Sequence, residues 1–442
     1  MNHPPLPDVR DPAVLLAHVR HTLSFYDPRA VDASGGFFHF FRDDGEVYDR
    51  HTRHLVSSTR MVFNAAMAWR HFGQPQHGEQ LQHGLRFLRQ AHRQSDTGGY
   101  WWQLSWRDGR AQSLDATNHC YGLAFVMLAY AHAVMAGQTQ AQPWLEETWD
   151  LLQARFWQPE HGLYADEASA DWSQLDSYRG QNANMHLCEA LLAAHEATAQ
   201  PHYLERAAVL ARHMCQRQAA LAGGLIWEHY HADWQPDWDY NRHDKTNIFR
   251  PWGFQTGHLT EWAKLLLTLE RQIQAHAQLD PAVLLQPWAE VHWLAPRAQE
   301  LFDVAMQRGW DEQHGGLVYG FGPDGSWCDS DKYFWVQAES LATAGLLALR
   351  QSDAVEAVRY WSWYDRIWAY SWAHFVDHQH GAWYRIKSRE GRAYSDEKSP
   401  AGKVDYHTMG ACYEVVRALQ GAPRGGRLPL PLRADGAVGA AP

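Results

Sequence analysis

Two kinds of helical segment alternate along the chain. Segments such as residues 120–136 and 185–194 are apolar on nearly every side, and a helix of that kind must be buried. Segments such as residues 144–152 and 203–210 carry apolar side chains on one face only, which is typical of a helix with one side in water. The alternation predicts inner helices that are each covered by an amphipathic outer helix.

A short motif divides the chain into six units. The second residues of its glycine-containing doublets lie 63, 63, 62, 92 and 65 residues apart, so only the fourth unit is long. Strand-like stretches such as residues 37–41 and 100–102 follow, and turn signals such as Asp43-Asp44-Gly45 predict a small hairpin or loop. The six instances are Gly35-Gly36-Phe37, Gly98-Gly99-Tyr100, His161-Gly162-Leu163, Gly223-Gly224-Leu225, Gly315-Gly316-Leu317 and His380-Gly381-Ala382.

Six units of this kind predict an all-α fold, a closed (α/α)6 barrel of six inner and six outer helices with short hairpins at one mouth. One catalytic domain then spans residues 1–420. An open solenoid is the alternative, but it needs unlike terminal caps, and the first and last units look like ordinary members. Residues 421–442 are rich in Pro, Gly and Ala and fall outside the repeat, so we expect a flexible tail there.

The amino-acid composition restricts the classes of partner that the protein is expected to bind. Of 442 residues, 45% are hydrophobic and 20% charged, which is a globular balance. The 39 Lys and Arg against 50 Asp and Glu give a net charge of −11, which argues against nucleic acid and anionic membranes as partners. The first 20 residues contain four prolines and no apolar stretch of signal-peptide length, so we expect a cytoplasmic protein, either a monomer or a homodimer. The five cysteines include no CxxC pair and suggest neither a disulfide framework nor a zinc cluster.

The openings of the inner helices form the candidate site, because in such a barrel they converge at one mouth. His186, His258 and His407 place an imidazole at the same station in three separate units, although most of the 28 histidines are expected on the surface or in the core. An arginine at such an opening is suited to holding substrate oxygens. The 23 Trp residues can fill the core or stack against sugar rings. The residues at these openings are Arg60, Asn118 with His119, Asn184 with His186, His258 with Glu261, Trp335 with Glu339, and His407.

Carboxylates accompany two of these imidazoles in the sequence. Glu261 follows His258 by three residues, and Asp405 precedes His407 by two, so we expect each to fix the tautomer of its histidine and raise its basicity. Phosphate-loop, dinucleotide and nucleophile-elbow motifs are absent. The most suggestive local pattern for metal ligation, His229-x-His231, lacks a cluster of further ligands, and no metal site is expected. The residues therefore point to imidazole acid/base chemistry in an aromatic cavity.

Four segments in order resemble the N-acylglucosamine 2-epimerase superfamily, and more narrowly its bacterial aldose–ketose isomerase branch. The likeness runs from the first repeat to about Leu419. One departure is Leu259-Thr260, where a more polar first residue is expected. The segments are Ser57-Ser58-Thr59-Arg60, Asn182-Ala183-Asn184-Met185-His186, the stretch from Asn247 to Leu265 with Arg250-Pro251-Trp252-Gly253 and Glu261-Trp262-Ala263-Lys264, and Asp405-Tyr406-His407-Thr408-Met409-Gly410.

The resemblance implies an (α/α)6 barrel without metal or organic cofactor. It implies an aldose–ketose isomerase that interconverts D-mannose and D-fructose, with D-lyxose and D-xylulose as a second pair, through a cis-enediolate. His258 and His407 are then the acid/base pair, with His186, Arg60 and Glu261 beside them. The candidate substrate-binding residues are Asn184, Trp335, Glu339, His119 and Asp405.

Three other functions stay open on the sequence alone. A sugar 2-epimerase uses the same intermediate but returns the proton to the opposite face. An inverting glycosidase would use Glu261 and Glu339 as its two carboxylic acids. A sugar-binding protein without catalysis would need the Trp residues and not the imidazoles.

Overall fold

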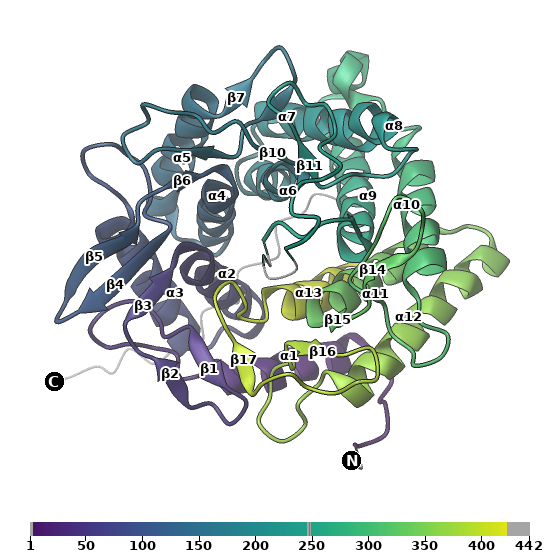
Figure 1. Ribbon diagram of the computed structural model, residues 1–442, viewed down its shortest axis with the longest axis horizontal. Coiled ribbons are helices and arrows are strands. Elements are labelled where there is room, and N and C mark those ends of the chain that lie inside the picture. The colour runs from purple at the N-terminus through teal and green to yellow at the C-terminus, as the bar shows by residue number, and fades with distance from the viewer. Residues whose placement is uncertain (1–2, 245–246, 248, 422–442) are drawn as a thin grey trace, which may run out of the picture.

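The computed structural model describes residues 3–244, 247 and 249–421, and Figure 1 views it along the axis of two concentric rings of helices. Ile248 and residues 422–442, the expected tail, lie outside the described residues. Within the described part, the inner ring comprises α2 (Leu55–Phe72), α4 (Cys120–Met135), α6 (Gln181–Thr198), α9 (Thr256–Leu279), α11 (Phe334–Arg350) and α13 (Tyr406–Leu419). The outer ring comprises α1 (Pro12–Tyr26), α3 (Pro75–Phe87), α5 (Gln142–Arg155), α7 (Pro201–Arg212), α10 (Leu294–Gly309) and α12 (Ala354–His374).

Short helical turns and strands connect the rings. The helical turns are η1 (Leu88–His92), η2 (Thr139–Ala141), η3 (His213–Gln218), α8 (Ala219–Leu221), η4 (Pro281–Leu285) and η5 (Pro287–Ala289). The strands are β1 (Phe40–Arg42), β2 (Val47–Asp49), β3 (Thr52–His54), β4 (Gln103–Arg107), β5 (Arg110–Asp115), β6 (Asn118–His119), β7 (Trp157–Gln158), β8 (Leu163–Tyr164), β9 (Glu167–Ala168), β10 (Arg179–Gly180), β11 (His229–Tyr230), β12 (Phe254–Gln255), β13 (Gly320–Phe321), β14 (Trp327–Asp329), β15 (Lys332–Tyr333), β16 (Ile386–Lys387) and β17 (Glu397–Ser399).

Burial follows the two hydrophobic patterns. Nearly every residue of α4 is buried, whereas the neighbouring outer helix α5 buries only Leu145, Thr148 and Leu152. A helix that is apolar all round has no wet face to offer, so it takes the inner position. Helix α2 begins at Leu55, where the His54 side chain caps the helix by accepting from the backbone N–H of Val56.

The ring is closed by contacts between its first and last units. Strand β17 pairs antiparallel with β1, with Ser399 opposite Phe41. The Asn64 amide on α2 donates to the carbonyl of Val404 at 2.7 Å, and α13 packs against both α2 and α11. The predicted (α/α)6 barrel is therefore confirmed, and the open solenoid is not what the chain forms.

The extra residues of the long fourth unit lie at both ends of the barrel. Phe249 and Pro251, from the described part of the segment between β11 and β12, line the mouth where the inner helices begin, and η4 with η5 lengthens the link from α9 to α10 at the other end. Four of the five cysteines are buried. Among the described helices, none combines the length and apolar character that a membrane span requires.

Candidate active site

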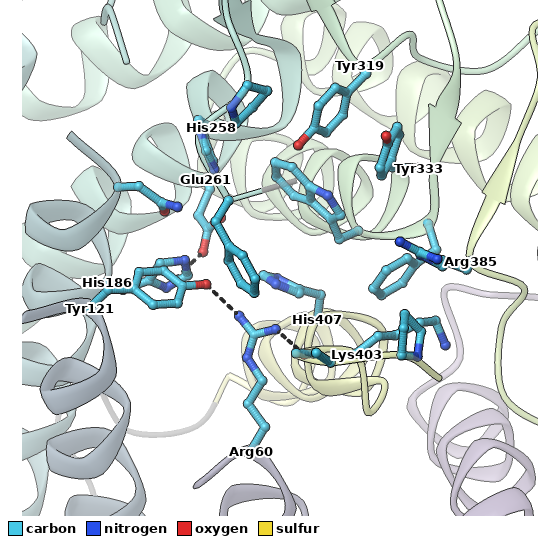
Figure 2. Close-up of a pocket in the computed structure, with 18 residues that line it drawn as sticks. Arg60, Tyr121, His186, His258, Glu261, Tyr319, Tyr333, Arg385, Lys403 and His407 are labelled. Atoms are coloured by element: carbon cyan, nitrogen blue, oxygen red, sulfur yellow. Dashed lines mark hydrogen bonds and ion pairs between the residues drawn. The ribbon is translucent and has the colours of Figure 1, made fainter. Parts of the chain in front are cut away.

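A cavity lies at the mouth formed by the N-terminal turns of the inner helices, and all six of them contribute to it (Figure 2). The helix residues that line it are Arg60, Tyr121, Asn182, His186, His258, Glu261, Phe334, Trp335 and His407. Connecting segments add Phe249, Pro251, Tyr319, Tyr333, Arg385, Pro400, Ala401, Gly402 and Lys403. The convergence expected from the repeat thus brings His186, His258 and His407 into one cavity with Arg60, Glu261 and Trp335.

His258 is held by a carboxylate from the loop before β11. Its Nδ1 lies 2.9 Å from Glu228 Oε1, while the Gln181 amide donates to Glu228 Oε2 at 2.9 Å and the Trp262 indole donates to Gln181 Oε1 at 2.8 Å. A carboxylate can only accept, so Nδ1 of His258 carries the proton and Nε2 keeps its lone pair. The expected partner Glu261 does not take this place, because its side chain is directed toward His186.

His407 has a different carboxylate partner from the one the sequence suggested. Its Nδ1 lies 2.7 Å from Glu339 Oε1, and the amine of Lys264 contacts the other oxygen of Glu339. Glu339 therefore positions His407 from behind and does not line the cavity. Asp405, the expected partner, instead accepts from Lys403 Nζ at 2.7 Å.

The third imidazole belongs to a separate unit. His186 Nδ1 lies 3.1 Å from Glu189 Oε2, and the hydroxyl of Tyr406 donates to Glu189 Oε1. Glu189 lies one helical turn after His186, so its i,i+3 spacing was a signal that sequence reasoning could have used. Glu228 offered no comparable signal, because it reaches His258 from a segment 30 residues away.

Burial shifts the pKa values of His186 and His407 in one direction and that of Glu261 in the other. It lowers the pKa of His186 to about 4, and burial together with the charge of Arg60 holds the pKa of His407 well below its usual range. Both rings are therefore neutral at neutral pH and can accept a proton. Burial, reinforced by Glu339, raises the pKa of Glu261 well above its usual range. Both oxygens of Glu261 are buried without a hydrogen-bond partner among the described residues, so a protonated Glu261 can donate to a substrate oxygen.

Arg60 is the cation of the cavity without a carboxylate partner among the described residues. Its guanidinium donates to the Gly402 carbonyl at 2.5 Å and to the Tyr121 hydroxyl at 3.4 Å, and it stacks over the ring of Phe125. Neutral partners leave its positive charge uncompensated. It is therefore suited to stabilising an oxyanion that forms on the substrate.

Trp335 lies between the two principal imidazoles. Its ring centroid is 5.0 Å from that of His258 and 5.7 Å from that of His407. A Cβ at Gly257 would lie 2.3 Å from the Trp335 ring, so the glycine before His258 allows this close approach. The indole gives a sugar ring a flat apolar face beside both nitrogens that can move protons.

Besides Glu339, three expected substrate contacts lie outside this cavity. His119 faces a neighbouring cavity, stacked on Trp102, with its Nδ1 3.1 Å from Glu167. Asn184 and Asp405 are buried and hold the backbone of the turn that follows the doublet of their unit, at Tyr164 and Trp383 respectively.

The same backbone clamp recurs in four units, which explains much of the polar pattern at the helix openings. Asn118 accepts from the N–H of Tyr100, and Gln337 both accepts from and donates to the backbone of Leu317. Buried backbone groups must be paired, and a side-chain amide at the helix opening pairs them. Some of the polar residues that recur at the helix openings therefore stabilise the fold and do not line the cavity.

Two groups of side chains have the composition of a metal site. One potential ligand atom each from Glu261, Glu339 and His407 lies within 4.8 Å of the others, and the same holds for His186, Glu189 and Glu261. Both oxygens of Glu339 already accept hydrogen bonds, one of them from Lys264, so an amine supplies the positive charge there. Both ring nitrogens of His229 are engaged as well, by the Tyr178 hydroxyl and the Pro251 carbonyl.

The closed barrel and its cavity of carboxylate-held imidazoles define a class: enzymes that move protons on a small polyhydroxy substrate. The model of the N-acylglucosamine 2-epimerase family matches residues 36–411. The chain is 52% identical over 406 residues to D-mannose isomerase of Marinomonas mediterranea, covering 92% of this chain and 97% of the relative. It belongs to the N-acylglucosamine 2-epimerase family.

Solved structures agree in fold. A crystal structure of D-mannose isomerase superposes with a TM-score of 0.85 at 51% identity, over 93% of this chain and 99% of the other. Cellobiose 2-epimerase from Spirochaeta thermophila superposes with a TM-score of 0.77 at 24% identity, over 92% and 96%, and supports the fold alone. The predictions of family, barrel and sugar isomerase are confirmed.

Proposed function

We propose that this protein interconverts D-mannose and D-fructose by moving the carbonyl between C1 and C2 through a cis-enediolate. The observation that carries the proposal is the pair His258 and His407, which both lie beside the Trp335 ring, each with its Nδ1 held by a carboxylate. The 52% identical relative that is named D-mannose isomerase supports this choice of substrate. D-lyxose and D-xylulose are the second pair that the same chemistry would serve.

The roles follow from what each group can do. His407, kept neutral by its surroundings, takes the proton from C2 and returns it to C1, while His258 exchanges protons with the sugar oxygens. Arg60 stabilises the enediolate oxygen, and the neutral carboxyl of Glu261 donates to an oxygen of the substrate. His186 opens the pyranose ring, because only the open chain has the carbonyl that reacts.

The other functions are less well supported. A 2-epimerase would use the same two imidazoles from opposite faces, but the Arg250-Pro251-Trp252-Gly253 and Glu261-Trp262-Ala263-Lys264 segments favour the isomerase branch. An inverting glycosidase needs carboxyl groups about 6.5 to 9.5 Å apart. Glu261 and Glu339 have oxygens within 4.8 Å of each other, and both oxygens of Glu339 are occupied.

The direct test is incubation of the purified protein with D-mannose, D-fructose, D-glucose and D-lyxose, with the products separated by chromatography. We expect fructose from mannose, mannose from fructose and xylulose from lyxose. Recovery of all four sugars unchanged would refute the proposal. We further propose a cytoplasmic protein whose catalytic domain spans residues 1–420, as a monomer or homodimer, which size-exclusion chromatography distinguishes.

A further inference from the structure

The cavity holds one more imidazole–carboxylate pair than the carbon chemistry requires. His258 with Glu228 and His407 with Glu339 supply the two proton-transfer groups for C1, C2 and their oxygens. The third pair, His186 with Glu189, shares no hydrogen bond with either of them among the described residues, and the second donor to Glu189 is Tyr406. It is a separate hydrogen-bonded unit, so a substitution there removes no hydrogen bond from the other two pairs, while the charge of Glu189 still acts on His407 and Lys264.

The His186–Glu189 pair lies at a different place in the cavity from the two pairs that act on C1 and C2. Figure 2 shows His186 beside Tyr121 on one side of the cavity, with His258 and His407 at separate positions around it. The His186 and His407 ring centroids are 6.3 Å apart. Glu261 lies next to His186, with Oε1 3.8 Å from Nδ1, and neither of its oxygens has a partner among the described residues.

A base and an acid placed together in this way match the needs of ring opening. Opening a hexopyranose removes the proton from O1, forms the C1=O double bond, breaks the C1–O5 bond and puts a proton on O5. Nε2 of His186 accepts the first proton, since Nδ1 is held by Glu189, and the carboxyl of Glu261 supplies the second. Burial favours the required starting forms, neutral His186 and protonated Glu261.

The reverse steps close the ring and restore both side chains. Rotation about C1–C2 in the open chain presents the other face of the carbonyl to O5. The O5 proton then returns to Glu261, and the proton on His186 returns to O1, so the other anomer forms without any further reactant. No proton leaves carbon in this cycle, which separates it from the isomerisation.

We propose that the protein is also a mutarotase, which interconverts the α and β pyranoses of its aldose with His186 as the base, Glu189 and Tyr406 as its positioning residues and Glu261 as the acid. The proposal rests on the proposed function in taking D-mannose as the sugar that binds and His186 as the residue that opens its ring, and it adds the acid, the positioning residues and the exchange of anomers. It predicts that anomer exchange and isomerisation can be impaired separately.

Two matched variants test the separation, because each replaces a carboxylate behind one imidazole. Crystalline α-D-mannose is dissolved in a weakly catalytic buffer at low temperature, and anomer exchange is followed by polarimetry and proton NMR, with fructose measured in parallel. Loss of the carboxylate that orients a metal-binding histidine costs about 10- to 100-fold. We expect the same scale for a catalytic histidine, so Glu189→Gln should slow catalysed anomer exchange by at least about tenfold. Glu228→Gln should slow fructose formation by a similar factor and leave anomer exchange at the wild-type rate. Tyr406→Phe, which removes only the second donor of Glu189, should slow anomer exchange less than Glu189→Gln.

The outcomes are distinct. The mutarotase would be overturned if neither the wild-type protein nor Glu228→Gln exchanged anomers faster than buffer does. It would also be overturned if Glu189→Gln and Glu228→Gln each lost anomer exchange and fructose formation to the same extent. Circular dichroism and the midpoint of thermal unfolding establish that each variant is folded. Should wild-type protein form no fructose from mannose but still exchange its anomers, the proposed isomerase would fail and the mutarotase would stand.

Discussion

At the residue scale, each cavity imidazole depends on a carboxylate that arrives from a different place in the chain. Glu189 comes from the same helix as His186, Glu339 from the neighbouring inner helix, and Glu228 from a loop. His186, His258 and His407, which sequence position placed at helix openings, line the cavity because these openings converge in a closed ring, whereas His119 does not. Sequence position paired two of them with the wrong carboxylates, since adjacency along the chain does not determine which side chain is directed at Nδ1.

We predict that His258→Ala and His407→Ala each lower kcat by at least about 100-fold, the usual scale for a lost general acid or base. Both side chains line the cavity, so truncation leaves the hydrophobic core in place. His231→Ala serves as the control, because that side chain is 59% exposed and lies outside the cavity. Steady-state kinetics with circular dichroism measure the effect, and near-normal turnover in either cavity variant would show the acid/base assignment to be wrong.

Activity should also survive removal of metal ions. The amine of Lys264 contacts Glu339, and the negative charge of Glu339 raises the pKa of Lys264 despite burial, so it stays positively charged. A divalent cation at Glu339 would have to displace this amine. Prolonged EDTA treatment followed by assay should leave kcat unchanged, whereas loss of activity that Mn²⁺ or Co²⁺ restores would contradict the account.

At the scale of elements, periodicity predicted the helices well because inner and outer positions impose different burial. The doublets marked the turns between the rings, and hydrogen bonds across these turns recur, as from Asp311 N–H to the Gly316 carbonyl and from Asp377 N–H to the Ala382 carbonyl. The sequence alone could not distinguish a polar residue that holds a turn from one that lines the cavity. Asn184 and His186 lie two residues apart on α6, yet only His186 lines the cavity.

Because Asn184 holds the turn and does not line the cavity, we predict that Asn184→Ala lowers stability without changing substrate binding. The side chain pairs both the N–H and the C=O of Tyr164, at 2.9 and 3.0 Å. Leaving buried polar groups unpaired costs about 1 to 3 kcal/mol each, so the free energy of unfolding should fall by at least about that amount. KM for D-mannose should stay the same. Denaturant unfolding and steady-state kinetics test this, and a raised KM at unchanged stability would restore Asn184 to the substrate site.

At the scale of the whole molecule, burial of histidines ties stability to pH. Burial lowers the pKa of His18, His54 and His132 to about 3 and that of His92 to about 4. Unfolded histidines titrate near pH 6.5, so below that pH the unfolded chain binds protons that the folded chain does not. Stability is therefore full above about pH 6.5 and falls as the pH drops toward 4.

The expected loss is large, because each such histidine contributes up to about 1.4 kcal/mol per pH unit in this window. Thermal unfolding followed at several pH values between 7.5 and about 4.5 should show a midpoint that falls steeply on acidification. His54→Gln, which removes one of these titrating groups, should flatten the slope. A midpoint that is constant over the window would show that the buried histidines do not control acid stability.

The closed ring gives one central cavity to six inner helices, and the central claim is that its imidazoles return the enediolate proton to C1. Purified protein is incubated with D-mannose in D₂O, and products are followed by NMR from the earliest times. We predict that D-fructose accumulates first, with deuterium at C1 that is diluted by direct transfer from C2, and with little D-glucose. D-glucose labelled at C2 that forms before any D-fructose would mean that protonation occurs from the opposite face, and would make the chain a 2-epimerase.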